Sequence, residues 1–301
     1  MNTSISHDNY LNMNVYVIEN DKLIVKVLKD FGAKILSIYH KETDYELLFQ
    51  PTKNEYKIPK LGDSFEEYDT SGVDEMLPTI DPCFYPNSYV KLNDHGDVWA
   101  QKWENDINDN TLISKVRSDT LKLDLHRSIT LEDDEIILSY KLKNLTEQDH
   151  YYLWAFHGLL NFNDKTELEF PTNGEIINVL DSTTYDFDYK KLSEYPDKNS
   201  YKFYFVDEID NGEVKIFQRD KNLEIKYNFS TDINKYLGVW VTKGGFKGEY
   251  NFAIEPSSGF YDSLERAFLN KKASKIDSKD EKNWELKIKV SKGEINGWTK
   301  I

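Results

Sequence analysis

Apolar and polar residues alternate in short runs along most of the chain, and polar turns separate these runs. The clearest example is residues 15–19, which Asn20 and Asp21 join to residues 23–27. Alternation with a period of two places every second side chain on one face of a strand, and two such runs joined by a two-residue turn predict a β-hairpin. A chain with this pattern gains stability by burying one face of each strand, so we expect an all-β protein.

The same pattern predicts further strands. They are residues 35–39, 112–117, 121–129, 135–142, 152–154, 214–218, 223–229, 236–242, 252–254 and 284–289. The 20 Tyr, 16 Phe and 6 Trp residues favour half-buried strands. Helical signal is confined to residues 262–270, with Asp262 as a possible N-cap, and to one turn at 64–68. Because we find no repeat, low-complexity tract or linker, we expect residues 1–301 to form one β-sandwich or barrel domain.

The charge balance excludes some classes of function. With 38 Lys and Arg against 53 Asp and Glu, the formal net charge is −15, which argues against a nucleic-acid-binding surface. The single Cys83 permits no internal disulfide and no cysteine-rich zinc site. Residues 1–13 lack the features of a signal peptide, and no apolar run reaches the roughly 20 residues of a membrane helix. We therefore expect a cytoplasmic protein, as a monomer or homodimer, that binds neither nucleic acid nor membrane.

Three residues stand out as candidates for chemistry. His95 lies within Leu-Asn-Asp-His-Gly-Asp-Val-Trp, where Asp94 and Gly96 suit a turn that presents the histidine. His157 lies in an aromatic, apolar run and needs a hydrogen-bond partner once buried. Glu255 ends an apolar run directly before Pro-Ser-Ser-Gly, where desolvation can tune a carboxyl for acid–base work. Each of the three taken alone also has an ordinary structural explanation.

The order of these three segments resembles that of the aldose 1-epimerase (galactose mutarotase-like) superfamily, over nearly the whole chain. Residues 20–37 are similar to the family's opening hairpin and turn. Arg127, Tyr140 and Asn144 occupy the positions of its "R…y.v.N" strands. Residues 237–240 (Leu-Gly-Val-Trp) precede Glu255 and Pro256 as the family's "lgvW…EP" does.

The resemblance implies a large antiparallel β-supersandwich with a sugar site on a concave face. It implies an aldose 1-epimerase that interconverts α and β anomers of a small-molecule sugar without a cofactor or metal. In this scheme His157 protonates the ring oxygen, Glu255 takes the proton of the anomeric hydroxyl, and His95 supports charge near the ring oxygen. Opening a hemiacetal requires these two proton transfers, which a group titrating near neutrality and a carboxylate can supply.

One departure from the family concerns sugar recognition. No arginine precedes Arg117, although the family grips the sugar with an arginine before the first histidine. Residues 71–82 are instead similar to divergent branches with a "GxDExxPT" segment. Asp74 and Glu75 can accept hydrogen bonds from sugar hydroxyls or can equally cap a loop. Trp99 and Trp240 are candidates to stack on the apolar face of a pyranose.

The missing arginine leaves a second interpretation open, namely a carbohydrate-binding protein with weak or lost catalysis. The identity of the sugar stays open, and we favour an unphosphorylated one. A bound cation is a less favoured possibility, because several acidic residues lie close together in sequence and carboxylate oxygens are ligands for hard cations. These residues are Asp69, Asp74, Glu75, Asp81, Asp94 and Asp97.

Overall fold

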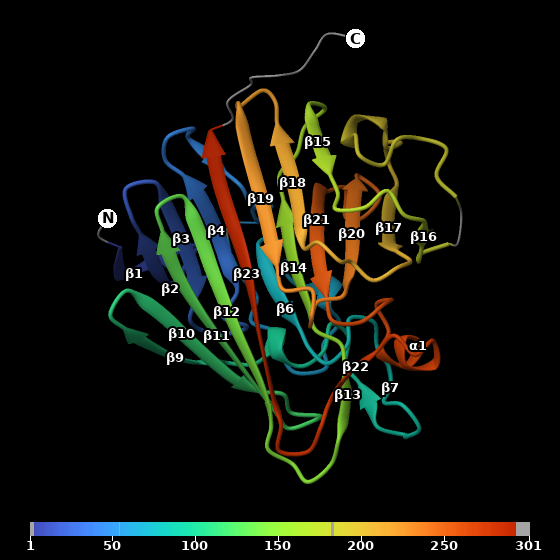
Figure 1. The fold of residues 1–301 in the computed structure, drawn as a ribbon. Helices are drawn as coiled ribbons and strands as arrows, with labels where there is room; N and C mark the ends of the chain where they lie inside the picture. The colour runs from blue at the N-terminus through green and yellow to red at the C-terminus, as the bar shows by residue number, and fades with distance from the viewer. Residues whose placement is uncertain (1–2, 54, 182–183, 293–301) are drawn as a thin grey trace.

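The structure is a computed structural model that describes residues 3–53, 55–181 and 184–292 (Figure 1). Two antiparallel β-sheets carry most of the described chain, which confirms the predicted all-β fold class. Among the described residues, no helix is long and apolar enough to cross a membrane.

The larger sheet has 11 strands. In spatial order they are β1 (Ser4–Tyr10), β2 (Met13–Glu19), β3 (Leu23–Leu28), β4 (Ile35–His40), β6 (Val73–Met76), β14 (Ala155–Leu160), β21 (Tyr250–Ser257), β20 (Tyr236–Lys243), β17 (Ser200–Phe205) and β16 (Ile176–Asn178), with β5 (Tyr45–Glu46) paired to β4. Strands far apart in sequence, β6, β14 and β21, thus lie side by side at its centre.

The second sheet has eight strands and packs against the first. In spatial order they are β15 (Thr166–Glu169), β18 (Glu213–Gln218), β19 (Leu223–Phe229), β23 (Glu281–Lys292), β12 (Glu135–Asn144), β11 (Leu123–Glu132), β10 (Thr111–Arg117) and β9 (Glu104–Asn108). The remaining elements are short: β7 (Cys83–Phe84) pairs with β8 (Lys91–Leu92), β13 (His150–Tyr152) pairs with β22 (Ser274–Ile276), and the helices are η1 (Phe65–Glu67), η2 (Val98–Ala100), η3 (Leu192–Glu194) and α1 (Leu264–Leu269).

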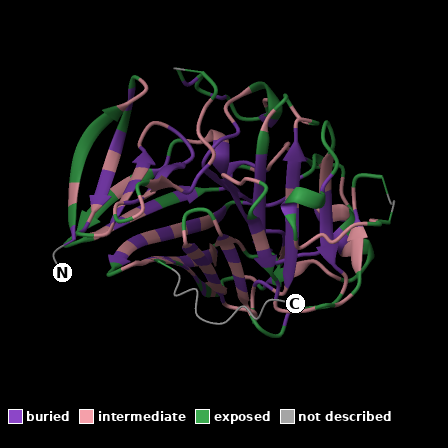
Figure 2. Ribbon diagram, turned by 90° about the horizontal axis from the view of Figure 1, so that it is seen from above, coloured by how far each residue is buried: buried purple, intermediate pink, exposed green. Residues whose placement is uncertain are grey.

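The alternation in sequence corresponds to alternate burial in the second sheet. Every second residue of β11 and β12 is buried, which appears as purple and pink bands in Figure 2. The buried side chains form one hydrophobic cluster with the facing side of the larger sheet. Removing this apolar area from water is the main favourable contribution to folding.

The central strands of the larger sheet are instead buried on both faces. All six residues of β14 are buried. Phe156 and Leu160 belong to the cluster between the sheets, whereas His157 and Leu159 lie on the opposite face and line a cavity. The strand period of two thus divides one short strand between core and cavity.

Several predicted boundaries need adjustment. The run predicted at 152–154 is divided, because β13 ends at Tyr152 and β14 begins at Ala155. The helix predicted at 262–270 is α1, and its N-cap is Ser263, whose hydroxyl accepts a hydrogen bond from the Arg266 amide at 3.3 Å. Asp262 is not the cap, because its carboxylate faces the cavity. The helical turn predicted at 64–68 is confirmed as η1.

Candidate active site

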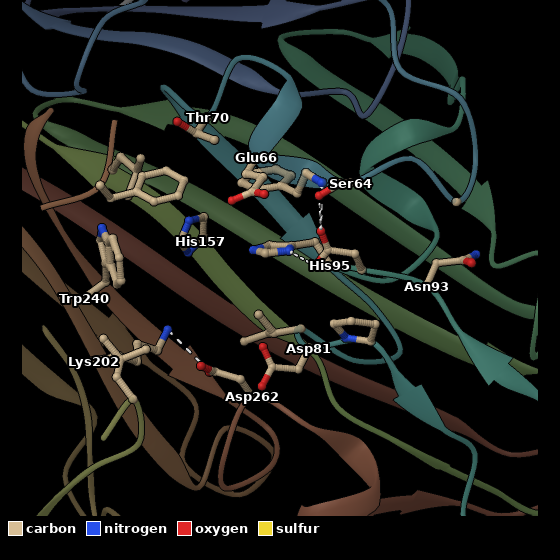
Figure 3. A pocket seen from close by; sticks show the side chains of 18 of the residues that line it. Ser64, Glu66, Thr70, Asp81, Asn93, His95, His157, Lys202, Trp240 and Asp262 are labelled. Atoms are coloured by element: carbon tan, nitrogen blue, oxygen red, sulfur yellow. Dashed lines mark hydrogen bonds and ion pairs between the residues drawn. The ribbon is translucent and has the colours of Figure 1, made fainter. Parts of the chain in front are cut away.

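A cavity of about 530 Å³ lies on the face of the larger sheet that points away from the second sheet (Figure 3). Its floor comes from β14, β17, β20 and β21, which contribute His157, Lys202, Trp240 and Asn251. Its walls come from loops on either side of η1 and before η2, and from the segment that precedes α1. The volume is within the range of small-molecule sites.

His95 is presented by a turn, as the sequence predicted, and the backbone of this turn is left-handed. Its φ is 57° and that of Gly96 is 76°, and the His95 amide donates to the Ile80 carbonyl at 2.6 Å. Nδ1 of the ring lies 2.8 Å from Oδ1 of Asp94, and the ring stacks on Phe65 at a centroid distance of 4.0 Å. The backbone hydrogen bond, the contact with Asp94 and the stacking on Phe65 therefore fix the imidazole against the cavity wall.

Asp94 is an ionised hydrogen-bond acceptor for His95. Burial opposes its ionisation, but the hydrogen bond and charge of His95, the Phe65 amide and the Ser64 hydroxyl together lower the pKa of Asp94. Because an ionised carboxylate only accepts hydrogen bonds, Nδ1 of His95 carries the proton of the neutral ring.

His157 and Glu255 meet across β14 and β21. Nδ1 of His157 lies 3.1 Å from Oε1 of Glu255, and the other carboxylate oxygen of Glu255 accepts a short hydrogen bond from Nζ of Lys202. Glu255 is completely buried and does not line the cavity. The base that the resemblance implies is thus enclosed beneath His157 and Lys202, because both of its oxygens are engaged there.

The charges around Glu255 keep it ionised. Burial alone would raise its pKa, but the positive charges and hydrogen bonds of Lys202 and His157 outweigh burial and lower the pKa to about 2. Lys202 is stabilised in turn: burial opposes its charge, whereas Asp262 and Glu255 raise its pKa. Its Nζ lies 3.5 Å from Oδ1 of Asp262, which also accepts from the Tyr204 hydroxyl at 2.7 Å.

The two candidate stacking tryptophans have different positions. Trp240 lines the cavity, and its indole N–H donates to Oδ1 of Asn251 at 3.1 Å. Trp99 is only 2% exposed and lies behind Phe65, with its N–H donating to the Asp94 carbonyl at 3.0 Å. Trp240 can therefore contact a ligand directly, whereas Trp99 supports the turn that carries His95.

Asp74 and Glu75 do not line the cavity, so the structure does not place them against a sugar. Asp74 pairs in register with His157, and its carboxylate forms a buried ion pair with Lys34 at 2.5 Å. Burial raises the pKa of Asp74 although Lys34 opposes this. Asp74 thus lies close to His157 but has its own partner.

Glu75 points to the other face of β6, into the space between the sheets. Its carboxylate accepts from Arg127 at 3.0 Å, from the Tyr140 hydroxyl at 2.8 Å and from the Trp154 indole at 2.9 Å. Burial raises the pKa of Glu75, and these three donors act in the opposite direction. Neighbouring residues of a strand face opposite sides of the sheet. Asp74 and Glu75 are neighbours on β6, so they cannot both face the sugar site as the sequence interpretation required.

Sequence reasoning missed the polar groups that complete the cavity. Lys202 lies in an aromatic strand, Ser-Tyr-Lys-Phe-Tyr-Phe, and a lysine in such a strand is a signal because buried lysines need partners. Asp262 was interpreted as a helix cap. Asp81, which the sequence suggested only as a cation ligand, opens to the cavity, and partial burial and the nearby Asp262 raise its pKa.

The acidic residues considered as cation ligands are dispersed among separate partners. Asp97, for example, accepts from the Ser118 hydroxyl at 2.6 Å and the Thr120 amide at 2.8 Å. In the part of the chain that the structure describes, no group of three or more His, Cys, Asp or Glu side chains is arranged to hold a metal ion.

Comparison by sequence finds no matching family model and no matching curated protein. Comparison of structures finds close matches over the whole length. The Slr1438 protein from Synechocystis sp. PCC 6803 has a TM-score of 0.73 at 17% identity, covering 97% of this chain and 99% of that one. A galactose mutarotase-like protein from Clostridium acetobutylicum has a TM-score of 0.71 at 13% identity, with 97% and 99% covered.

A candidate aldose 1-epimerase from Escherichia coli K12 has a TM-score of 0.72 at 14% identity, covering 93% of this chain and 99% of that one. At such identities the similarity establishes the arrangement of the chain and not its chemistry. With its two packed antiparallel sheets and its strand order, the chain has the galactose mutarotase-like fold.

Proposed function

We propose that the protein is an aldose 1-epimerase that interconverts the α and β anomers of a free aldose. The observation that carries this proposal is the pair of imidazoles, His95 and His157, which line one cavity with each Nδ1 held by a carboxylate. Proton transfer to and from hemiacetal oxygens requires groups that gain and lose protons near neutral pH, and imidazole has that property.

The rest of the cavity suits a neutral sugar. Trp240 offers an aromatic face for the C–H surface of a pyranose. Lys202, Asp262, Asp81 and Asn251 supply hydrogen-bond donors and acceptors for hydroxyl groups. A cavity with one aromatic face and several convergent polar groups is typical of small-ligand sites.

One observation favours a second candidate, a sugar-binding protein without turnover. Glu255 is enclosed and bonded to Lys202, so it has to change its contacts before it can act on a sugar in the role that the resemblance gives it. In that case the protein binds an aldose in stoichiometric amounts, and the anomers interconvert no faster with the protein than in buffer alone.

Anomer exchange, measured by polarimetry and by exchange NMR with a panel of free aldoses, separates the two candidates. An epimerase accelerates exchange for at least one sugar, and His157→Asn abolishes the acceleration. His126→Asn is the matched control, because His126 lies on β11 of the other sheet. If no sugar exchanges faster than in buffer, the enzyme proposal is wrong, and calorimetry with the same panel then tests for binding alone.

A further inference from the structure

His157 lies between two carboxylates in a row that crosses the centre of the larger sheet. On one side, Asp74 of β6 pairs with His157 of β14 in register. On the other side, the register in which Ala155 pairs with Ser257 places His157 opposite Glu255 of β21. Residues paired in this way point to the same face of a sheet, with Cβ atoms about 4.5–5.5 Å apart. The two carboxylates therefore flank the imidazole on the cavity side of the sheet.

Each of these carboxylates is paired with a buried lysine. Nζ of Lys34, which directly precedes β4, lies 2.5 Å from Oδ2 of Asp74, and both side chains are only 1% exposed. Lys34 is fixed further, because it also donates to the Asp69 carbonyl at 3.1 Å. Lys202 donates a short hydrogen bond to Glu255. The imidazole is thus the group that can change its charge between two buried ion pairs.

The chemistry assigned to His157 requires a proton on the ring. In the scheme that the resemblance implies, His157 donates to the ring oxygen of the sugar, so it has to be protonated beforehand. His157 is 8% exposed, and burial disfavours a charged imidazole, whereas an anion within about 6 Å favours it. Glu255 is one such anion, but in the same scheme it loses its charge when it takes the proton of O1–H. The scheme gives Asp74 no proton to transfer, so a charge on Asp74 stays in place throughout the cycle.

We propose that Asp74 and Lys34 form a positioning pair for the acid of the reaction, in which the carboxylate of Asp74 favours the protonated form of His157 and Lys34 holds that carboxylate in place. This inference rests on the proposed function and deepens it. Asp74 acts through His157, and it is a positioning residue in place of the sugar-binding residue that the sequence suggested.

Lys34 has a defined part in this arrangement. Burial raises the pKa of Asp74, and Lys34 and then His157 oppose this increase. A buried carboxylate keeps its charge only with a close and well-placed partner, and Lys34 is that partner. The interaction of Asp74 with His157 is mutual, because a protonated ring stabilises the carboxylate by the same energy as the carboxylate stabilises the protonated ring.

Other titratable groups lie around His157 and share in its titration. They are Glu255 of β21 with Lys202 of β17, His95 with Asp94 from the turn before η2, Glu66 of η1, and Asp81 and Asp262 at the cavity wall. The midpoint of the His157 titration therefore belongs to this coupled set. The contribution of Asp74 is measured as the change in that midpoint between variants.

The first test is an NMR titration of the His157 ring in the full chain, which needs no sugar. Asp74→Asn removes the anion and leaves the cation of Lys34 in place. A unit charge about 5–6 Å away in a buried site changes a titration midpoint by about 1–2 pH units. We expect the ring in Asp74→Asn to lose its proton at a pH at least about 1 unit lower than in wild type. Equal midpoints in the two proteins overturn the proposal.

Glu75→Gln is the matched control for this titration. Glu75 is the neighbour of Asp74 on β6, and it also belongs to a buried ion pair, with Arg127 at 3.0 Å. Its side chain points to the opposite face of the sheet, away from His157. We expect a clearly smaller shift of the His157 midpoint in Glu75→Gln than in Asp74→Asn. A shift at least as large means that the loss of any buried charge moves the midpoint, and the inference is then wrong.

A double variant guards against a failure to fold. Asp74→Asn leaves Lys34 buried without an anion, which destabilises the protein, whereas Asp74→Asn combined with Lys34→Met removes both charges and keeps a side chain of similar length. We expect the His157 midpoint to fall in the double variant as well, by less than in Asp74→Asn, because Asp74 and not Lys34 is the cross-strand neighbour of the ring. A double variant that titrates as wild type does overturns the proposal. Thermal unfolding checks that each variant is folded.

The second test is the pH profile of kcat/KM for anomer exchange. The basic limb reports the loss of the proton from the acid, so we expect it to move to lower pH in Asp74→Asn by the same amount as the NMR midpoint. Above the limb, kcat/KM then falls about tenfold for each pH unit of the shift, and below the limb it stays close to wild type. If KM instead rises at every pH and the limb does not move, Asp74 binds the sugar and the inference is wrong.

The two tests separate this inference from the proposed function. If no aldose exchanges faster than in buffer, the proposed function fails, and a role of the pair in catalysis fails with it. The NMR titration is independent of turnover, so it still shows whether Asp74 controls the charge of His157. If anomer exchange is accelerated but the midpoint is equal in wild type and Asp74→Asn, the proposed function stands and only the inference fails.

Discussion

Replacing Glu75 by glutamine tests whether this residue stabilises the fold or binds the substrate. Glu75 and Arg127 are both 0% exposed and 3.0 Å apart, and Tyr140 and Trp154 also donate to the carboxylate. Glutamine keeps one acceptor oxygen, but its NH2 group is a donor and would face the N–H donor of Trp154 or Arg127, so a hydrogen bond is lost. The buried guanidinium then has no compensating anion.

The magnitude follows from the geometry of this pair. Removing one partner of a buried ion pair costs about 3–5 kcal/mol, because the remaining charge stays desolvated. With a urea dependence of about 3 kcal/mol per M, this corresponds to a fall of about 1–1.7 M in the unfolding midpoint. We expect this fall in Glu75→Gln, together with an anomer-exchange rate per folded molecule within about twofold of wild type.

The assay is urea unfolding followed by tryptophan fluorescence, paired with exchange NMR in the absence of urea. Glu281→Gln is the matched control, since Glu281 contacts Lys141 and Lys143 at the surface and its loss should leave the midpoint unresolved from wild type. An unchanged midpoint in Glu75→Gln with lost sugar turnover would refute the reasoning and return Glu75 to the binding site.

Two further predictions concern the turn and the buried carboxylate. Gly96→Ala places a Cβ 2.1 Å from the Leu77 carbonyl oxygen at a φ of 76°, so we expect this substitution to displace His95 and to lower the rate of anomer exchange at least tenfold. Gly248→Ala is the control, because Gly248 has a φ of 72° and no neighbour within 4 Å of the added Cβ. Equal activity of the two variants would contradict the prediction. For Glu255, the pKa of about 2 lies below the ordinary glutamate value of 4.5, so its ionisation contributes stability that is complete above about pH 4.5 and is lost as the pH falls towards 2. Urea unfolding between pH 7 and 3 should show wild type losing more stability than Glu255→Gln, and parallel curves would be inconsistent with the low pKa.

Much of the fold could be predicted from the sequence. The strand predicted at residues 223–229 coincides with β19, and the hairpin predicted over residues 15–27 is β2 and β3. Alternation is a local property, because each residue reports only on its own side of a strand. The short central strand β6 was missed, because all four of its residues are buried and it shows no alternation.

The candidate site could be predicted in part. His95, His157 and Trp240 were named from local sequence and line one cavity. Asp74 and Glu75 were treated as equivalent, although they point to opposite faces of β6 and meet Lys34 and Arg127. The sequence shows that neighbouring side chains on a strand point to opposite faces of the sheet. Which of the two faces holds the cavity depends on where the second sheet and the loops pack.

By itself the sequence determined the all-β fold class, the turn at His95 and the order of the chemical residues, since these depend on local spacing and backbone preference. Only the tertiary structure decided that Lys202 pairs with Glu255 beneath the cavity floor and that Asp262 faces the site instead of capping a helix. The physical reason is that the partner of a buried charge is chosen by sheet order, which brings β17 and β21 near each other across β20. The period of the apolar residues and the amino-acid composition do not specify this long-range strand pairing.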